Sequence, residues 1–316
     1  MNMKQYLVFD WGGTYLKYAL MNEEAEILEK GEVPSPARDA CREDFYSVLD
    51  PVVEKYRNVI SGIAVSSAGI IDSFRGIIRV VAVFPFLNGC HIKEELEERY
   101  GLPFTIENDG KSAALAEYWR GSLKGCDSGA VMLIGTGIGG GLTLDGKLRR
   151  GNDFLAGEFS SMIIDINHRD EPEGYWASLG YRGLLKRYTQ QCEEDASDID
   201  GRTFFERLKE GDEKAETALK QYTDDLAAAL FSLNMLLNLD CISIGGGISA
   251  APELMAYLQR SIDEIPEWNP DMRAGLNFPL PCVKVCEFHN DANLIGALFH
   301  HLSDKLETQQ TKHKVL

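Results

Sequence analysis

The sequence is short of basic residues. It contains 32 Lys and Arg residues against 49 Asp and Glu residues, which is a formal net charge of -17. Nucleic-acid surfaces are built from clustered Lys and Arg side chains, so this balance argues against a nucleic-acid partner. We therefore expect any bound phosphate group to be met locally, by backbone N–H groups and a divalent cation.

Paired cysteines and long apolar segments are missing as well. The seven cysteines are an odd number, are widely scattered, and no two are separated by only two residues. We expect them to be reduced thiols. No apolar run approaches the roughly 20 residues that cross a bilayer, and the first residues show no signal-peptide pattern. These absences predict a cytoplasmic protein without a membrane partner.

Strand-like and helix-like segments alternate along the chain, which predicts an α/β architecture. The first half has expected strands at residues 6–10, 15–22, 31–33, 59–71 and 103–108, and expected helices at residues 42–58, 92–101 and 111–121. The second half repeats this logic with strands around a glycine turn, a mostly helical region at 173–239, a strand at 241–244 and a final helix at 291–306. A chain of 316 residues with this pattern is expected to form two domains.

The densest glycine cluster lies between two expected strands. Five glycines fall within residues 135–141, and Gly135, Gly137 and Gly140 match the spacing G-x-G-x-x-G of dinucleotide sites. In those sites the third glycine opens a helix. Here the segment 140–148 alternates apolar and polar residues and contains a two-residue hairpin turn, so the glycines connect strands. This argues against an NAD-dependent dehydrogenase.

Two further glycine runs follow expected strands, Gly12-Gly13 and residues 245–247. Because glycine adopts positive φ freely, a glycine turn between strands can direct successive N–H groups at one phosphate. Two such turns facing each other would hold a triphosphate from both sides. The pattern therefore predicts a nucleotide site.

Five segments in order resemble the ROK family of sugar kinases, and the similarity extends over residues 6–298. The segments are FDWGGTYLKYAL, IENDGKSAALAE, IGTGIGGGL, AGEF and SIGGGIS. The resemblance implies the ribonuclease-H-like fold of actin-like ATPases, with two lobes and a central cleft. It assigns residues 1–118, completed by a C-terminal helix at 296–316, to an N-terminal lobe and residues 119–295 to a C-terminal lobe.

The same resemblance implies that the chain binds ATP and Mg²⁺. The implied cofactor-binding residues are Asp10, Gly12, Gly13 and Thr14 in the first turn, Gly135, Thr136, Gly137 and Gly139 in the second, and Gly245, Gly246 and Gly247 in the third. Asp10 stands at a strand end, where a hard carboxylate can hold Mg²⁺ directly or through water. Many relatives carry Lys directly after the Thr, whereas this chain has Tyr15. Lys17 is the nearest cation, and strand alternation puts it on the same face.

Asn108 and Asp109 are the expected chemical centre. Phosphoryl transfer needs an acceptor hydroxyl in line with the γ-phosphorus and a carboxylate that takes its proton. Asp109 suits that catalytic role, because the dipole of the helix that follows favours its ionised form. Asn and Asp are also common helix N-caps, and without the other motifs capping would be the better interpretation. The resemblance makes Asn108, Asp109 and Glu158 the substrate-binding residues for a sugar.

The chain departs from the family after Glu158. Most relatives continue with a His and a cysteine cluster that bind a structural zinc, whereas Ser161 stands at the His position and no Cys occurs between residues 126 and 192. We expect no zinc site and expect His168 to lie on a surface loop. In zinc-bearing relatives that His and a Glu contact the sugar near its anomeric carbon, and the aligned residues here are Ser161 and Gly174, with Glu173 one position away.

These two replacements should open space at the anomeric end of the sugar. We therefore predict a transferase that phosphorylates the 6-hydroxyl of a β-glucoside such as a disaccharide, with Trp176, Tyr175 and Phe86 as apolar faces for the aglycone. One alternative is a kinase for free glucose, fructose or N-acetylmannosamine. Another is a non-catalytic sugar-sensing regulator, which the presence of Asp10 and Asp109 argues against. Relatives are often dimers, so a homodimer is expected.

Overall fold

The computed structural model describes residues 3–192 and 199–314. The chain divides into two compact units. Unit 1 comprises Met1–Gly121, Leu148–Ala156 and Asn290–Leu316, and unit 2 comprises Ser122–Lys147 and Gly157–His289. The segment Leu148–Ala156 thus belongs with the first unit, although the residues on both sides of it belong to the second. The predicted lobe boundaries did not contain this excursion.

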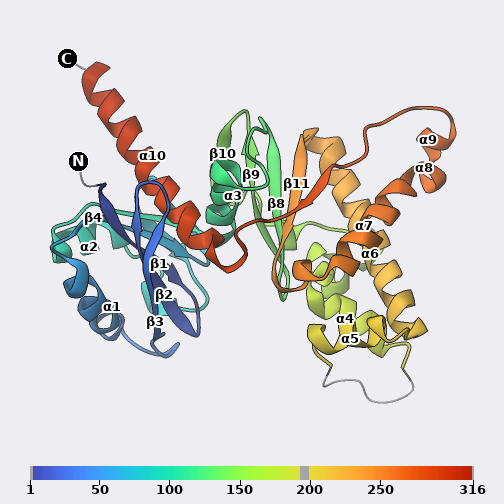
Figure 1. Cartoon of the computed structure of the whole chain (residues 1–316), viewed down its shortest axis with the longest axis horizontal. Coiled ribbons are helices and arrows are strands. Elements are labelled where there is room, and N and C mark those ends of the chain that lie inside the picture. The colour runs from blue at the N-terminus through green and yellow to red at the C-terminus, as the bar shows by residue number, and fades with distance from the viewer. Residues whose placement is uncertain (1–2, 193–198, 315–316) are drawn as a thin grey trace. The chain divides into compact units, whose positions relative to one another are not determined.

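The centre of unit 1 is a five-stranded sheet with the order β3-β2-β1-β4-β7 (Figure 1). Its strands are β1 (Gln5–Trp11), β2 (Tyr15–Asn22), β3 (Ile27–Pro34), β4 (Ile60–Ser67) and β7 (Phe104–Asn108). β2 is antiparallel to β1 and to β3, whereas β1, β4 and β7 are parallel. Parallel strands carry near-continuous apolar runs because both faces of the sheet are covered, and β4 is buried along almost its whole length.

Helices complete unit 1. They are α1 (Arg42–Tyr56), α2 (Ile92–Tyr100), α3 (Asp109–Arg120) and α10 (Ala292–Lys314). α10, from the far end of the chain, packs against α3 and against β1, β4 and β7 (Figure 1). A Cβ at Gly296 would lie 1.7 Å from the Ser112 carbonyl oxygen, so only glycine allows this close helix contact. This close packing of α10 on α3 places the first turn of α10 next to the sheet of unit 1.

The expected strand at 59–71 is interrupted in the structure. β4 ends at Ser67, and the chain then forms a small antiparallel hairpin of β5 (Ile70–Asp72) and β6 (Ile77–Val80). Gly69 lies between β4 and β5 with φ +105°, where a Cβ would lie 2.3 Å from the Val80 carbonyl oxygen. The apolar run continues through this bend because β5 is also partly buried, which is why the sequence pattern did not separate the two strands.

Unit 2 repeats the arrangement of strands. The second five-stranded sheet has the order β10-β9-β8-β11-β12, with β9 antiparallel to β8 and with β8, β11 and β12 parallel; all of its strands except β10 lie wholly in unit 2. The strands are β8 (Gly129–Ile134), β9 (Ile138–Leu144), β10 (Lys147–Arg149), β11 (Cys241–Gly245) and β12 (Val283–Val285). The predicted α/β class is confirmed, and the glycine-connected hairpins β1-β2 and β8-β9 occupy equivalent places in the two sheets.

The apolar core of unit 2 is formed by β8, β9 and β11 with the helices packed against them, above all α6. The helices are α4 (Tyr181–Thr189), α5 (Gly201–Lys209), α6 (Glu213–Leu237), α7 (Pro252–Asp263), α8 (Ile265–Trp268) and α9 (Pro270–Arg273). The Asp212 side chain accepts hydrogen bonds from Lys214 N and Ala215 N and so caps α6. Among the described residues, no helix is long and apolar enough to span a membrane.

Candidate active site

Polar residues of unit 1 meet at one edge of its sheet. Asp10 is the penultimate residue of β1, Asn108 is the last residue of β7, and Asp109 begins α3. In the strand register Asp10 lies beside Ser66, and Ser67 lies beside Asn108. Carboxyl ends of parallel strands share an edge, which is the usual place for a ligand in such sheets. The structure therefore brings together the two predicted carboxylates of this unit.

Asp10 is held by a residue from the other end of the chain. Its Oδ1 accepts a hydrogen bond of 3.1 Å from Asn293 Nδ2, in the first turn of α10. Burial raises the pKa of Asp10, the Asn293 hydrogen bond lowers it, the charge of Asp109 raises it, and the charge of Lys17 lowers it. Asp10, Asp109 and Lys17 are thus close enough to influence one another. Asn293 was missed at the sequence level, where it is one amide in an amphipathic helix.

Asp109 is partly buried at the start of α3. Its Oδ1 accepts hydrogen bonds from Gly110 N at 2.8 Å and from Asn108 Nδ2 at 3.0 Å. Burial raises the pKa of Asp109, and the hydrogen bond from Gly110 and the charge of Lys111 oppose this only in part. The helix dipole alone suggested a favoured ionised form, but desolvation has the larger effect. A raised pKa brings a carboxylate closer to the range of an effective general base.

Asn108 combines two roles that the sequence left as alternatives. Its Oδ1 accepts a hydrogen bond of 3.0 Å from Lys111 N, which caps α3. Its Nδ2 donates to the Gly69 carbonyl oxygen and to Asp109, each at 3.0 Å. An amide has two donors and two acceptor lone pairs, so one lone pair on Oδ1 is left for a ligand hydroxyl. Capping and substrate contact are therefore compatible at this residue.

The first glycine turn is held by hydrogen bonds to neighbouring backbone groups and to Ser35. Gly12 N donates to the carbonyl oxygens of Asp10 and Tyr15, each at 3.2 Å, and Ser35 Oγ donates to the Gly12 carbonyl oxygen at 2.6 Å. Gly13 and Thr14 are exposed. Neither glycine has positive φ. The expectation that these glycines are needed for left-handed conformations is wrong for this turn, because the constraint is space: a Cβ at Gly12 would lie 3.0 Å from the Tyr15 carbonyl oxygen.

The second turn, Gly135 to Gly137, is braced by residues that follow it in unit 2. Gly135 N donates to the Gly137 carbonyl oxygen, and Tyr181 N donates to the Gly135 carbonyl oxygen, each at 2.9 Å. Ser160 Oγ accepts from Ile138 N at 2.8 Å. Gly135, Thr136 and Gly139 are exposed, whereas the next glycine along β9 is buried. The turn thus presents its backbone outward on a fixed base.

A cavity of about 690 Å³ joins the second and third glycine runs within unit 2. Gly135, Thr136 and Gly247 line it, together with a wall from α5 that the sequence analysis did not identify. The cavity is lined by Ile134, Gly135, Thr136, Tyr181, Gly201, Arg202, Phe205, Glu206, Lys209, Gly247, Ile248, Ala250 and Ala251. Its size and its apolar side chains suit a ligand as large as a nucleotide. Its two cations are paired with carboxylates, Arg202 with Glu206 at 2.9 Å and Lys209 with Glu253 at 3.6 Å. No motif marks α5, because its amphipathic pattern is that of an ordinary surface helix.

The third run is a sharp turn between β11 and a 3₁₀ turn, Gly247–Ala250. Gly246 has φ +96°, and a Cβ there would lie 2.2 Å from the Ile134 carbonyl oxygen. Gly245 is buried in β11, so it supports the cavity and does not line it. A Cβ at Gly247 would meet no atom within 4 Å. Of the three glycines, Gly247 is the one that faces open space at the cavity.

Glu158 is partly buried next to the glycine-rich strand β9. It follows Gly157, which has φ +86° and whose Cβ would lie 3.0 Å from Gly141 Cα. Ser161 is exposed, three residues further on, and Ser161 N donates to the Glu158 carbonyl oxygen at 3.2 Å. His168 is exposed too, and its Nδ1 lies 2.6 Å from Asp165 Oδ2. The prediction that His168 lies on the surface is confirmed.

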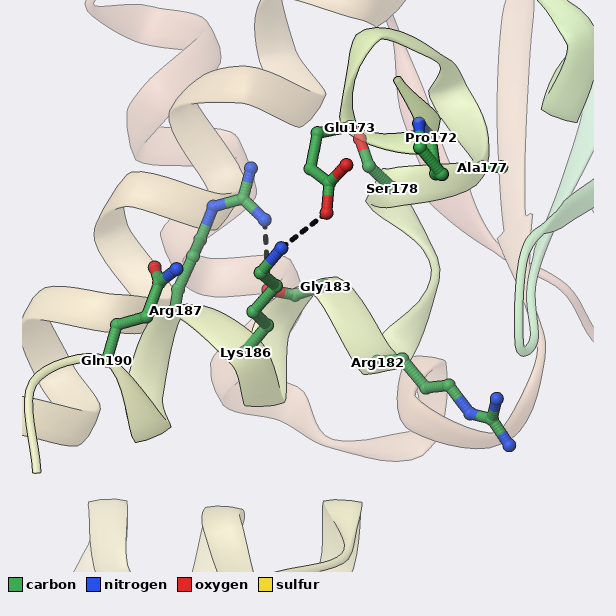
Figure 2. Close-up of a pocket in the computed structure, with 9 residues that line it drawn as sticks. All are labelled: Pro172, Glu173, Ala177, Ser178, Arg182, Gly183, Lys186, Arg187 and Gln190. Carbon is green, nitrogen blue, oxygen red and sulfur yellow. Dashed lines mark hydrogen bonds and ion pairs between the residues drawn. The ribbon is translucent and has the colours of Figure 1, made fainter. Parts of the chain in front are cut away.

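Glu173 lines a second cavity of unit 2, of about 420 Å³ (Figure 2). Figure 2 shows the Lys186 ammonium directed at the Glu173 carboxylate, while the Arg182 side chain points away from both. Lys186 Nζ lies 2.5 Å from Glu173 Oε1. The cation lowers the pKa of Glu173. Gly174 is buried, and a Cβ there would lie 2.0 Å from the His168 carbonyl oxygen, so this position excludes any side chain.

Trp176 does not offer a face to a ligand. It is 2% exposed and stacks on Phe159 at a centroid distance of 5.9 Å, in the core of unit 2. The prediction that Trp176 supports an aglycone is therefore wrong. Its apolar surface stabilises the segment that carries Glu158, and the residue type alone did not distinguish this role from ligand contact.

Comparison with known proteins gives consistent results. The model of a family described as the ROK family matches residues 6–300. A β-glucoside kinase of Klebsiella pneumoniae is 30% identical over 296 residues, which are 92% of this chain and 94% of that protein. A glucokinase of Thermotoga maritima is 28% identical and covers 78% and 83% of the two chains. The crystal structure of a ROK family protein from Streptococcus pneumoniae in complex with sucrose superposes with a TM-score of 0.85 at 27% identity, covering 96% of this chain and 99% of that one.

Proposed function

The chain belongs to the ROK family, and from that premise we propose that it transfers the γ-phosphoryl group of ATP to the 6-hydroxyl of a β-glucoside. Its fold is the actin-like ATPase fold of the ROK sugar kinases, and it is an ATP-dependent carbohydrate kinase.

Asp109 is the residue to which we assign acceptor activation. Its carboxylate takes the proton of the 6-hydroxyl as the oxygen bonds to the γ-phosphorus, and the bond from that phosphorus to the β–γ bridging oxygen breaks to release ADP. The support for this role is its position beside Asp10 at one sheet edge and a pKa raised by burial. Asn108 orients Asp109 through the hydrogen bond of 3.0 Å and offers its remaining lone pair to a sugar hydroxyl.

Nucleotide and metal fit the remaining residues. We assign the adenine side of ATP to the cavity at Gly247 and the phosphates to the exposed backbone of the glycine turns. Asp10 would hold Mg²⁺, because a carboxylate oxygen is the ligand type that this ion prefers. Two nearby carboxylates with raised pKa values are the electrostatic setting in which a divalent cation is favourable.

The acceptor assignment rests on one observation, the loss of two large polar side chains at Ser161 and Gly174. Ser161 is exposed with a short side chain, and Gly174 has no space for any side chain. Glu173, one position before Gly174, is paired with Lys186. A β-substituent at the anomeric carbon would then meet no large polar group from these positions. The 30% identity to a β-glucoside kinase over nearly the whole chain supports the same acceptor.

A sugar panel with ATP tests the acceptor. We expect kcat/KM for cellobiose or phenyl β-glucoside to exceed that for glucose by about 10-fold or more, which corresponds to roughly 1.4 kcal/mol of transition-state binding. Glu158→Ala should raise the sugar KM and leave the ATP KM unchanged. Free glucose, fructose or N-acetylmannosamine as the preferred acceptor would contradict the proposal and favour the glucokinase-like alternative, and no turnover of any sugar would leave the sugar-sensing regulator. A homodimer and a cytoplasmic location stay predictions.

A further inference from the structure

A buried ion pair lies directly behind Asn108. Glu107 is fully buried at the end of β7, and its Oε2 accepts a hydrogen bond of 2.7 Å from Arg150 Nε, whose side chain is 15% exposed. Arg150 lies in the segment Leu148–Ala156, the excursion of the chain into unit 1. Arg150 lies outside the segments considered above, and Glu107, although it lies in the segment IENDGKSAALAE, was given no role there. Taking two charges out of water is costly, so a fully buried carboxylate with an arginine partner calls for a reason other than stability.

The two oxygens of Glu107 have different partners. While Oε2 faces Arg150, Oε1 accepts a hydrogen bond of 2.9 Å from Asn108 N. Asn108 then holds Lys111 N, Gly69 and Asp109 through its side chain. An unbroken chain of hydrogen bonds therefore runs from the Arg150 guanidinium to the carboxylate that we assign to acceptor activation. Rotation of the Glu107 carboxylate would break the first bond of that chain.

Arg150 itself is fixed from two further sides. Arg150 Nη2 lies 3.3 Å from His300 Nδ1. The guanidinium carbon of Arg150 lies over the Phe74 ring, 5.1 Å from the ring centroid. Because arginine can only donate, His300 Nδ1 must accept, which places the proton of a neutral ring on Nε2. Burial lowers the pKa of His300, which agrees with a neutral ring. The guanidinium plane is thus held in one orientation, as a bidentate or stacked arginine is and a lysine is not.

We propose that Arg150, acting through Glu107, is a positioning residue that sets the orientation of Asn108 and Asp109 toward the sugar. This inference rests on the proposed function for its consequence in catalysis, but its structural part does not. If the ion pair only fastened Leu148–Ala156 to the rest of unit 1, its loss would leave the start of α3 unchanged. If the ion pair instead orients the backbone N–H group of Asn108, its loss speeds hydrogen exchange at residues 107–111.

The test uses the full chain with three substitutions. Arg150→Met removes the guanidinium and keeps much of its apolar stem. Arg150→Lys keeps one donor for Glu107 and loses the contact with His300. Arg149→Met is the matched control, because Arg149 is the exposed neighbour on the same segment. Each protein is measured for hydrogen exchange of a peptide covering residues 104–112, for thermal unfolding, and for KM and kcat with both substrates.

We expect Arg150→Met to speed exchange at residues 107–111 and to lower kcat/KM for the sugar by about 10- to 100-fold, as small misplacements at reacting groups do. The ATP KM should stay within about twofold, and Arg150→Lys should recover part of the loss. Arg149→Met should match the wild type throughout. Unchanged exchange in the folded Arg150→Met and Arg150→Lys proteins would overturn the inference. A fall in kcat accompanied by unchanged exchange at residues 107–111 would overturn it too, because a smaller folded fraction alone produces that result.

The two proposals fail separately. If the wild type phosphorylates no sugar while Arg150→Met still speeds exchange at residues 107–111, the proposed function is wrong and the positioning of Asn108 by Arg150 stands. If the wild type is an active kinase and exchange does not respond to Arg150, the positioning inference is wrong and the function stands. Where Arg150→Met does not fold, the exchange of the Arg150→Lys protein decides.

Discussion

At the residue scale, burial decides the chemistry of the site carboxylates. Asp10 and Asp109 both have a pKa raised chiefly by desolvation, and the hydrogen bonds from Asn293 and Gly110 only reduce the effect. The position of Asp109 at a helix start was readable from the sequence, but the size of its desolvation was not. Desolvation depends on what packs around the carboxylate, and α10 comes from residues about 180 positions away.

The substitution Asp109→Asn tests the general base. Asn can still accept from Gly110 N, so we expect ATP binding to persist while kcat falls by about two to four orders of magnitude. A carboxyl with a raised folded-state pKa contributes stability that is complete below its unfolded-state pKa and is lost as the pH rises through the folded-state pKa. The variant escapes this loss, so near neutral pH it should unfold at the same temperature as the wild type or higher.

The pH profile is the control for this assignment. Because the base must be ionised, wild-type kcat/KM should decline on the acid side at a pH above the ordinary range for an aspartate. The residual activity of Asp109→Asn should lack that decline. Full turnover by the variant, or an identical acid limb in both proteins, would contradict the assignment of Asp109.

At the element scale, the three glycine runs serve different physical needs. Gly12 is required because the Tyr15 carbonyl is close, and Gly246 because its φ is +96° and Ile134 is close. At Gly247 neither a positive φ nor a close backbone atom excludes a side chain, so the absence of a side chain there serves to leave the cavity open. A glycine pattern read from sequence predicts that a turn is present, but not which of these needs each residue meets.

Substitutions at the third glycine run separate binding from folding. Gly247→Leu extends into open space, so we expect an unfolding temperature close to that of the wild type and an ATP KM raised about 10-fold or more. Gly246→Leu is the matched comparison and should fail to fold or unfold at a much lower temperature, because it has both positive φ and a backbone clash. An unchanged ATP KM in a folded Gly247→Leu protein would remove the nucleotide from this cavity.

At the scale of the whole molecule, two units with the same strand arrangement each contribute glycine turns. Unit 1 contains the two predicted carboxylates Asp10 and Asp109, whereas unit 2 contains the cavity assigned to the nucleotide. The N–H groups of the turns carry no net charge, and the chain has a net charge of -17. Few positive side chains are therefore left to neutralise a bound triphosphate. We therefore expect phosphoryl transfer to require a divalent metal ion.

Ligand-dependent stability tests that requirement. A nucleotide at about 100 times its dissociation constant should stabilise the folded protein by roughly 2.7 kcal/mol, seen as a higher unfolding temperature. We expect this with Mg-ATP, a smaller effect with ATP and a chelator, and none with NAD. Asp10→Ala should lose most of the difference between the first two conditions. Stabilisation by NAD alone would contradict the kinase assignment.

The sequence by itself determined the alternation of strands and helices, the glycine turns between strands, and the placement of Asp10 and Asn108-Asp109 at strand ends. These are local properties, because strand alternation and turn chemistry depend on neighbouring residues. Only the tertiary structure decided that Asn293 donates a hydrogen bond to Asp10 and that Arg150 pairs with Glu107. It also decided that α5 lines the cavity and that Trp176 lies in the core. Each of these contacts joins segments that are distant in sequence or depends on packing from several elements, and no local pattern encodes which distant surface a side chain will meet.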